Sequence, residues 1–169
     1  MKARTTPEME KEEIEFILSY IKPTPKSFFE WGSGGSTIFF EKFCSRYVSI
    51  EHFQDWANLI QPLVGEKVEY YIIPNNKPRS DNDTPKEDFL DYVNAVDSFK
   101  GQIFDFVLVD GRARKFCAER ALDIINDNSI VFIHDWSRPR YREYVLDFYD
   151  IVEELHGIVA LKKKKILSE

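Results

Sequence analysis

The chain has 169 residues, a formal net charge of −6, and 43% hydrophobic and 15% aromatic residues. A chain of this length can bury the core of one domain, and its aromatic content excludes disordered and collagen-like proteins. The acidic balance argues against a dedicated nucleic-acid binder, and no apolar run is long enough to span a bilayer. The amino terminus lacks the apolar core of a signal peptide, so we expect a cytoplasmic protein.

Segments with apolar residues at helical spacing alternate along the chain with short apolar runs that are typical of strands. A helix is predicted over 7–22, with Thr6 as its cap and Pro7 in its first turn. Apolar runs then predict strands at 27–32, 47–52, 68–74, 104–110 and 129–136. Apolar residues at helical spacing predict helices at 36–44, 53–64, 86–99, 114–125 and 139–148. The last two segments, 149–155 and 158–165, flank His156-Gly157, a two-residue sequence that suits a hairpin turn.

This alternation predicts an α/β fold with a single Rossmann-like doubly wound sheet of seven strands, mostly parallel, with helices on both faces. The sheet is expected to end in an antiparallel hairpin. No repeat or linker divides the chain, so we expect residues 1–169 to form one domain with a leading helix over 1–22. Residues 75–99 combine a long polar loop at 75–85 with a helix, and loops of this length often clamp a substrate.

The sequence contains only 7 glycines, about 4% of its residues against the usual value of about 7%. Four of them follow predicted strands: Gly32, Gly34 and Gly35 in EWGSGGST, and Gly111 after the strand at 104–110. Doubly wound folds bind ligands at the carboxyl ends of their strands. Glycine there permits a tight turn and lets an anionic or polar ligand approach the backbone N–H groups of the following helix.

Glu51 ends the second predicted strand, about 20 residues after the glycine turn, where a carboxylate can accept hydrogen bonds from a ribose diol. The alternative is a solvated strand end. His52 either borders an adenosine pocket or is an exposed residue at the start of a helix. A nicotinamide site is disfavoured because Thr37 stands where the last glycine of its motif belongs, and no Gly-Lys-Ser/Thr sequence of a phosphate-binding loop follows the turn.

EWGSGGST with Glu51, FDFVLVDGRAR, VFIHDW and the terminal hairpin resemble the class I S-adenosylmethionine-dependent methyltransferases over nearly the whole chain. VDGRARKFCAERAL followed by HDWSRPRY is similar to small bacterial and viral methyltransferases that act on sugars and polysaccharides. The resemblance implies S-adenosyl-L-methionine as cofactor, with Glu51 at its ribose and Asp110 also in contact with it. It places six residues around the methionine part of the cofactor: Glu30, Gly32, Ser33, Gly34, Ser36 and Thr37. Ser36 stands where many members have a third glycine.

Methyl transfer from a sulfonium to an oxygen is an in-line displacement, so the protein must align the acceptor and remove its proton. His134, at the ligand edge of the strand at 129–136, is predicted to be the general base, assisted by Asp110 and Asp135. The alternative is a core histidine held by the backbone. The same three side chains could instead bind Mg²⁺ or Mn²⁺, since acids at these strand ends hold a metal in some related O-methyltransferases.

Arg112, Arg114 and Arg138 lie in loops beside the predicted site and are expected to bind a carboxylate, a phosphate or sugar hydroxyls of the acceptor. The resemblance, together with these residues, implies methyl transfer to a hydroxyl of a sugar or glycan. The alternatives are another small-molecule or phenolic hydroxyl, an RNA 2′-hydroxyl, and a non-catalytic binding module. The chain leaves little room for an acceptor-binding subdomain, so a longer polypeptide or a homo-oligomer is expected to help hold the acceptor.

Overall fold

The computed structural model describes residues 2–24, 26–77 and 86–165, so residues 78–85 of the predicted substrate loop lie outside the described residues. Within these ranges, seven strands form one sheet in the order β3-β2-β1-β4-β5-β7-β6. The first five are parallel, and β7 pairs antiparallel with both β5 and β6. Their bounds are β1 Ser27–Trp31, β2 Arg46–Glu51, β3 Val68–Ile72, β4 Phe106–Val109, β5 Ile130–His134, β6 Tyr149–Leu155 and β7 Ile158–Lys163. The predicted Rossmann-like sheet with a terminal hairpin is confirmed.

Short helices connect these strands. The α-helices are α1 Lys11–Ile21, α2 Gly35–Phe40, α3 Gln54–Ile60, α4 Leu90–Val93, α5 Arg114–Ala121 and α6 Pro139–Val145. Tighter 3₁₀ turns extend several of them, at Glu41–Phe43, Gln61–Leu63, Lys86–Phe89, Asn94–Phe99 and Leu122–Ile124. None of the helices in the described part of the chain has the length and apolar character to span a membrane.

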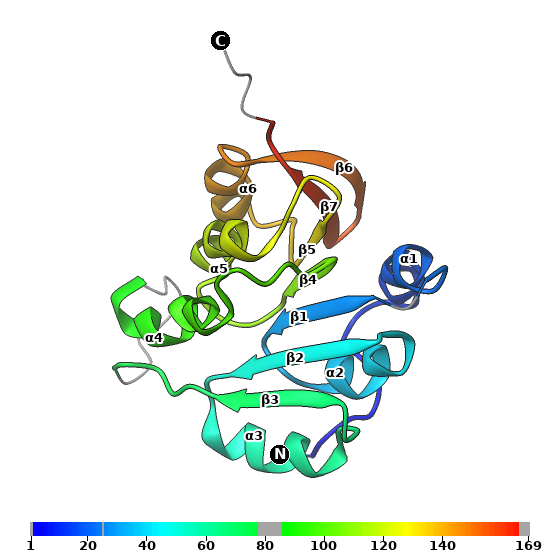
Figure 1. Cartoon of the computed structure of the whole chain (residues 1–169), viewed down its shortest axis with the longest axis vertical. Coiled ribbons are helices and arrows are strands. Elements are labelled where there is room, and N and C mark those ends of the chain that lie inside the picture. Colours follow the sequence, from blue (N-terminus) through cyan, green and yellow to red (C-terminus); the bar gives the residue numbers. More distant parts are fainter. Residues whose placement is uncertain (1, 25, 78–85, 166–169) are drawn as a thin grey trace.

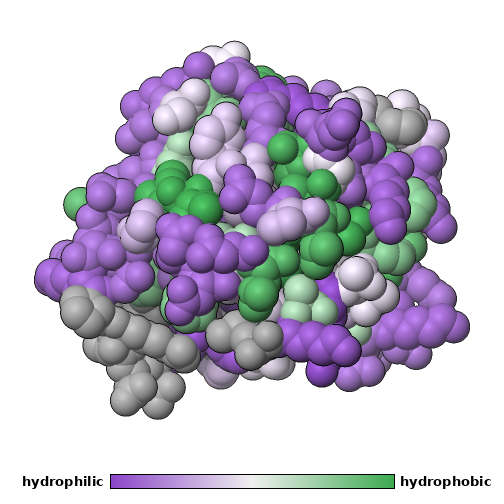
Figure 2. All heavy atoms as spheres, turned by 90° about the horizontal axis from the view of Figure 1, so that it is seen from below, coloured by the Kyte–Doolittle hydropathy of each residue, from purple (hydrophilic) through white to green (hydrophobic). Residues whose placement is uncertain are grey.

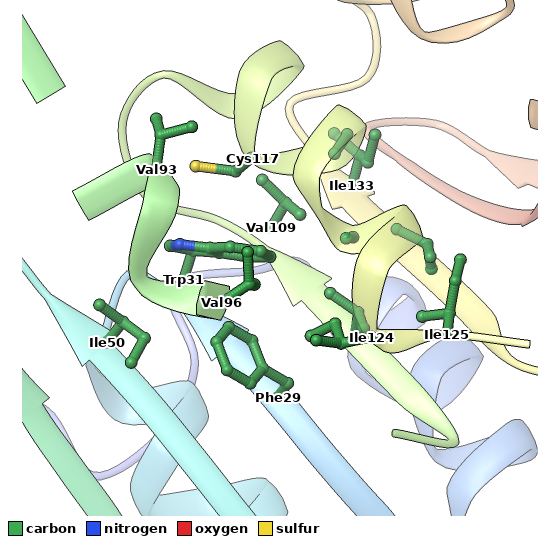
Figure 3. Packing of buried hydrophobic residues seen from close by; sticks show 14 of the residues in the cluster. Phe29, Trp31, Ile50, Val93, Val96, Val109, Cys117, Ile124, Ile125 and Ile133 are labelled. Atoms are coloured by element: carbon green, nitrogen blue, oxygen red, sulfur yellow. The ribbon is translucent and has the colours of Figure 1, made fainter. Parts of the chain in front are cut away.

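The sheet separates two hydrophobic cores, because successive strand residues point to opposite faces. On one face, residues of α4, α5 and α6 pack against alternate strand residues such as Trp31 and Val109. Figure 3 shows part of this core, with Cys117 among its members. On the other face, α1 and α2 pack on the intervening strand residues, including Phe28 and Phe132. Figure 1 shows α4, α5 and α6 on one side of the molecule and α1 and α2 on the other.

Two predicted helices differ most from the structure. The first begins at Lys11 rather than Pro7, because the Glu13 carboxylate accepts the backbone N–H of Glu10 at 2.9 Å and closes a capping box there. The predicted helix at 86–99 contains only one α-helical segment, α4, between two 3₁₀ turns. There the Trp31 indole N–H donates to the Tyr92 carbonyl, which a continuous α-helix would use for its own ladder.

The edge of the sheet at β3 exposes apolar side chains. Leu59 in α3 and Leu63 in the following turn are 37% and 46% exposed, and Tyr71 of β3 is 42% exposed. Figure 1 places α3 and β3 at the lower end of the molecule, and the view from below shows apolar surface between hydrophilic side chains. Scattered apolar exposure of this kind is ordinary for a folded protein.

Candidate active site

The loops that follow the neighbouring strands β1 and β4 touch each other through their glycines. Gly32 has φ +96°, a left-handed conformation that favours glycine. A Cβ atom on Gly32 would lie 2.5 Å from the Cα of Gly111. The backbone N–H of Gly32 donates to the Ile50 carbonyl, and that of Asp110 donates to the Trp31 carbonyl, both at 2.9 Å. Glycine at these two positions therefore allows the carboxyl ends of β1 and β4 to form one continuous surface, which is the floor of a cavity.

A cavity of about 1020 Å³ lies over this floor. It is lined by the β1–α2 loop, the ends of β2 and β5, the β4–α5 loop, and the amino-terminal part of α6, while Lys2 and Glu8 border it from the amino-terminal segment. Of the predicted site residues, twelve line the cavity: Gly32, Ser33, Gly34, Ser36, Glu51, His52, Asp110, Arg112, Arg114, His134, Asp135 and Arg138. Glu30 and Thr37 are not among the lining residues.

Glu30 lies beneath the glycine loop, where it is fully buried. Its carboxylate accepts hydrogen bonds from the hydroxyls of Ser36, Thr37 and Ser49 at 2.5, 2.6 and 2.8 Å. Thr37 Oγ1 in turn accepts the backbone N–H of Gly34 at 3.0 Å. Three side-chain hydroxyls therefore satisfy this carboxylate. Glu30 therefore contacts the glycine loop and the start of α2 through Ser36 and Thr37, beneath the cavity.

Burial raises the pKa of Glu30 from 4.5 to about 7, although its three hydroxyl partners act in the opposite direction. Because the pKa of Glu30 is higher in the folded chain than in the unfolded chain, this group favours the fold most at a pH below 4.5. This contribution is lost as the pH rises to about 7. We therefore expect the unfolding free energy of the wild type, relative to Glu30→Gln, to fall by on the order of 3 kcal/mol over this range. Urea denaturation at several pH values measures the difference, and parallel pH profiles for the two proteins would contradict it.

Glu51, at the end of β2, joins the glycine loop to the start of α3. Its Oε2 accepts the backbone N–H and the hydroxyl of Ser33, both at 2.9 Å. Its Oε1 accepts the backbone N–H groups of His52 and Phe53, both at 2.8 Å. Burial acts to raise the pKa of Glu51, but these hydrogen bonds and the His52 side chain lower it below its usual value, so the group is a carboxylate.

These four hydrogen bonds fill the lone-pair positions of the Glu51 carboxylate, and His52 Nδ1 also lies 3.0 Å from Oε1. One of them is replaceable, because the Ser33 hydroxyl also bonds to the Tyr70 hydroxyl and can turn toward it. A ligand diol can then take the vacated position on Oε2. Glu51 is thus a buried structural link between β2, the glycine loop and the start of α3.

His134, the last residue of β5, lies between two carboxylates. Its Nδ1 is 2.9 Å from Asp110 Oδ1, and its Nε2 is 3.2 Å from Oε2 of Glu13 in α1. Burial disfavours the charged imidazole, but the hydrogen bond to Asp110 and the charges of Asp110 and Glu13 raise the pKa of His134 above its usual value. The structure therefore favours an imidazolium that donates to both acids.

Asp135 was predicted to assist His134, but its carboxylate contacts two arginines. Its φ of +59° turns the chain directly after β5, and its carboxylate lies 2.9 Å from both Arg114 and Arg138. Arg114 also contacts the Asp110 carboxylate at 3.3 Å and donates to the carbonyls of Gly111, Asp110 and His134. Arg114 thus ties the ends of β4 and β5 together, and its guanidinium is engaged by the protein itself.

The predicted metal ligands do not form a metal site. Asp110 and Asp135 both face the guanidinium of Arg114, and both ring nitrogens of His134 face carboxylates. No group of three or more His, Cys, Asp or Glu side chains in the described ranges is arranged to hold a metal ion. The positive charge of Arg114 beside both acids opposes a divalent cation, so these residues do not fit Mg²⁺ or Mn²⁺.

Several residues of this site were not predicted from the sequence. Glu13 is 4% exposed. The sequence feature that could have identified it is a carboxylate four residues before Ile17, on the apolar face of the first helix. Phe53 is 43% exposed and lines the cavity beside Glu51. Trp56 also lines it and donates its indole N–H to the Ser33 carbonyl at 2.8 Å. An aromatic residue two positions after an acid at a strand end was the available signal for Phe53.

No protein-family model matches the sequence, and no curated protein matches it. Solved structures with similar folds include a methyltransferase-like protein from Silicibacter pomeroyi, at 24% identity over 95% of this chain and 90% of that chain, with a TM-score of 0.72. An O-methyltransferase from Bacillus cereus in complex with S-adenosylhomocysteine has 16% identity, covers 92% and 83% of the two chains, and has a TM-score of 0.69. The O-methyltransferase TomG from Streptomyces achromogenes, in complex with S-adenosylmethionine, has 16% identity, covers 92% and 82%, and has a TM-score of 0.64. This likeness establishes that the chain has the Rossmann-like fold of methyltransferases.

Proposed function

We propose that the protein is an S-adenosylmethionine-dependent O-methyltransferase. The observation that carries the proposal is the cavity where the glycine loop of β1, Glu51 of β2, Asp110 of β4 and His134 of β5 meet. The solved structures with this fold include O-methyltransferases whose cofactor or cofactor product is bound. The combination supports a nucleoside ligand next to a group that can handle a proton.

The residues present fit this cofactor. The cavity of about 1020 Å³ is at the upper end of the range of small-molecule sites, about 300–1000 Å³. At Gly34 the backbone is open to the cavity, and a Cβ atom there would lie 3.7 Å from the Trp56 ring. Ser33, Gly34 and Ser36 would hold the methionine part, and Glu51 with His52 and Phe53 would hold the adenosine. When bound, the sulfonium supplies an activated methyl group.

His134 is the proposed proton acceptor for the acceptor hydroxyl, with Asp110 holding Nδ1. It can act only after losing its own proton and its contact with Glu13. Since Glu13 and Asp110 raise its pKa, we expect kcat/KM to increase with pH through a value above 6.5. Asp135 and Arg114 would position the strand ends rather than take part in the proton transfer.

The variant Glu13→Gln tests this arrangement. It removes one of the two carboxylates that stabilise the imidazolium, so we expect the acid limb of the pH profile to move to lower pH. Glu12→Gln, on the exposed side of the same helix, should leave the profile unchanged. Steady-state rates from pH 5 to 9 measure the shift. An identical profile for wild type and Glu13→Gln would contradict the proposed role of His134.

The acceptor is proposed to be a hydroxyl of a sugar or glycan, and the protein is proposed to act in the cytoplasm. The cavity is open, and polar and charged side chains of the α6 end border it, which suits a hydroxylated acceptor better than an apolar one. A phenolic or other small-molecule hydroxyl is the second candidate.

The direct test is transfer of a labelled methyl group from S-adenosylmethionine to a panel of sugars, glycans and phenols. We expect methyl ethers in the sugar arm, with undiminished rates after exhaustive chelation, because the site does not fit a divalent cation. Transfer only to phenols would contradict the sugar proposal. Loss of activity on chelation would contradict the proposal that the reaction needs no divalent cation.

A further inference from the structure

The segment that precedes α1 borders the cavity at two points. Lys2 and Glu8 line it together with Trp56 of α3 and residues of the glycine loop. Figure 1 places the amino-terminal end of the chain beside α3. We call residues 2–9 the amino-terminal strap. The strap therefore supplies part of the cavity wall near both of its ends.

The middle of the strap lies directly on the glycine loop. A Cβ atom on Gly35 would overlap the carbonyl group of Thr6 and lie 3.0 Å from the Pro7 nitrogen. The φ of Gly35 lies outside the left-handed region, so the close approach of the strap, rather than a special backbone conformation, favours glycine here. Pro7 is buried, although Thr6 and Glu8 on either side of it are exposed. The strap is thus seated on the loop through Thr6 and Pro7.

Few polar interactions hold the strap in this place. Within the part of the chain that the structure describes, residues 2–9 form no hydrogen bond with the rest of the protein. Their only ion pair in the same ranges joins Arg4 to Glu8 inside the strap at 3.4 Å, and these side chains are 69% and 68% exposed. An exposed pair of this kind contributes little to stability. The strap is therefore held mainly by the packing of Pro7, and by Met9, which packs against the core below α1.

The start of α1, in contrast, is firmly anchored. The Glu13 carboxylate accepts the backbone N–H of Glu10 at 2.9 Å and lies 3.2 Å from Nε2 of His134. Ile17, one turn further along α1, is fully buried. A segment with few hydrogen bonds opens at a lower free energy than an element that is packed into the core. The strap can therefore move about Glu10 while α1 stays in place.

We propose that the strap closes over S-adenosylmethionine in the cavity, slows its release, and lifts from the glycine loop at Thr6 and Pro7 when the cofactor enters or leaves. The inference rests on the proposed function and adds how the cofactor is retained. A molecule that contacts both the glycine loop and the strap binds the closed position better than the open one, so it shifts the strap toward closure. Closure of this kind also limits the access of water to a bound ligand.

The first measurement is proteolysis of the strap. Trypsin cleaves after arginine, and Arg4 and Thr5 are both exposed. We expect saturating S-adenosylhomocysteine to slow cleavage of the Arg4–Thr5 bond several-fold, as followed by mass spectrometry. The bond between Lys100 and Gly101, which are exposed and not among the described residues that line the cavity, is the internal control. Its cleavage rate should not change.

Two variants loosen the strap from opposite sides of its contact with the loop. Pro7→Gly removes the buried ring, and Gly35→Ala places a Cβ atom against the Thr6 carbonyl. Both should speed cleavage after Arg4 in the absence of any ligand. Pro7 is not among the described residues that line the cavity, so its variant also reports on retention. Labelled S-adenosylhomocysteine, chased with the unlabelled compound, should leave Pro7→Gly about tenfold faster than the wild type.

Pro23→Gly is the matched control, because Pro23 is exposed and follows the other end of α1. It should keep the wild-type rates of cleavage and dissociation. The proposal is overturned if S-adenosylhomocysteine leaves cleavage of the Arg4–Thr5 bond unchanged, or if folded Pro7→Gly releases the compound at the wild-type rate. Equal acceleration in Pro23→Gly would also overturn it, since the effect would not depend on the contact with the loop. A wild-type protein that does not bind S-adenosylhomocysteine would contradict the proposed function and, with it, this role of the strap.

Discussion

Replacing His134 by alanine is expected to lower kcat by about two to four orders of magnitude while affinity for S-adenosylmethionine stays nearly unchanged. The side chain lies between Asp110 and Glu13 at the end of β5, where it is proposed to receive the proton of the acceptor hydroxyl. Steady-state kinetics, with cofactor affinity from calorimetry, separate the two effects.

The variant His134→Gln separates a loss of proton transfer from a loss of folding, because its amide can still donate to a carboxylate but cannot take up the proton. It should be as inactive as the alanine variant. His156→Asn, in the exposed β6–β7 turn, is the matched control and should retain wild-type rates. A folded His134 variant with an unchanged rate would remove this residue from the mechanism.

The second large effect is expected at Glu51. Glu51→Gln keeps the shape of the side chain but replaces one acceptor oxygen by an amide donor, next to backbone and side-chain donors that already face it. Loss of a charge-assisted hydrogen bond costs about 1.5–3 kcal/mol, so we expect the affinity for S-adenosylmethionine to fall about 10- to 100-fold. Calorimetric titration measures this change.

Glu69→Gln provides the comparison, because Glu69 lies on the neighbouring strand β3 and pairs with Arg46 rather than with the glycine loop. Its cofactor affinity should match that of the wild type. Wild-type affinity in a folded Glu51→Gln variant would show that Glu51 only links β2 to the loop, and would contradict its proposed contact with the ribose.

The sequence predicted the fold well because alternating hydrophobic periods determine which strands and helices form and which residues share a face. The position of Glu51 and His134 at the cavity follows from the same reasoning, since both end parallel strands. The helix at 86–99 was predicted less well, since 3₁₀ turns flank α4 and its Tyr92 carbonyl accepts a tertiary hydrogen bond from Trp31 that the local pattern does not show.

The contacts within the site could not be predicted in the same way. Glu13 and His134 are 121 positions apart in the sequence, and they meet because α1 packs across the sheet. Asp135 was expected beside His134, but its left-handed backbone conformation directs the carboxylate toward Arg114 and Arg138. Arg114 was predicted to bind substrate, and its contacts with Asp110, Asp135 and three carbonyls are those of a residue that positions the strand ends.

The most direct test of the central claim is the stability of the protein in the presence of S-adenosylmethionine. A ligand that binds only the folded chain stabilises it by about 2.7 kcal/mol when present at 100 times its dissociation constant. We expect the unfolding midpoint to rise with the concentration of S-adenosylmethionine and of S-adenosylhomocysteine, and this rise to be strongly reduced in Glu51→Gln. A folded wild-type protein whose unfolding midpoint does not change at millimolar concentrations of either compound would contradict it.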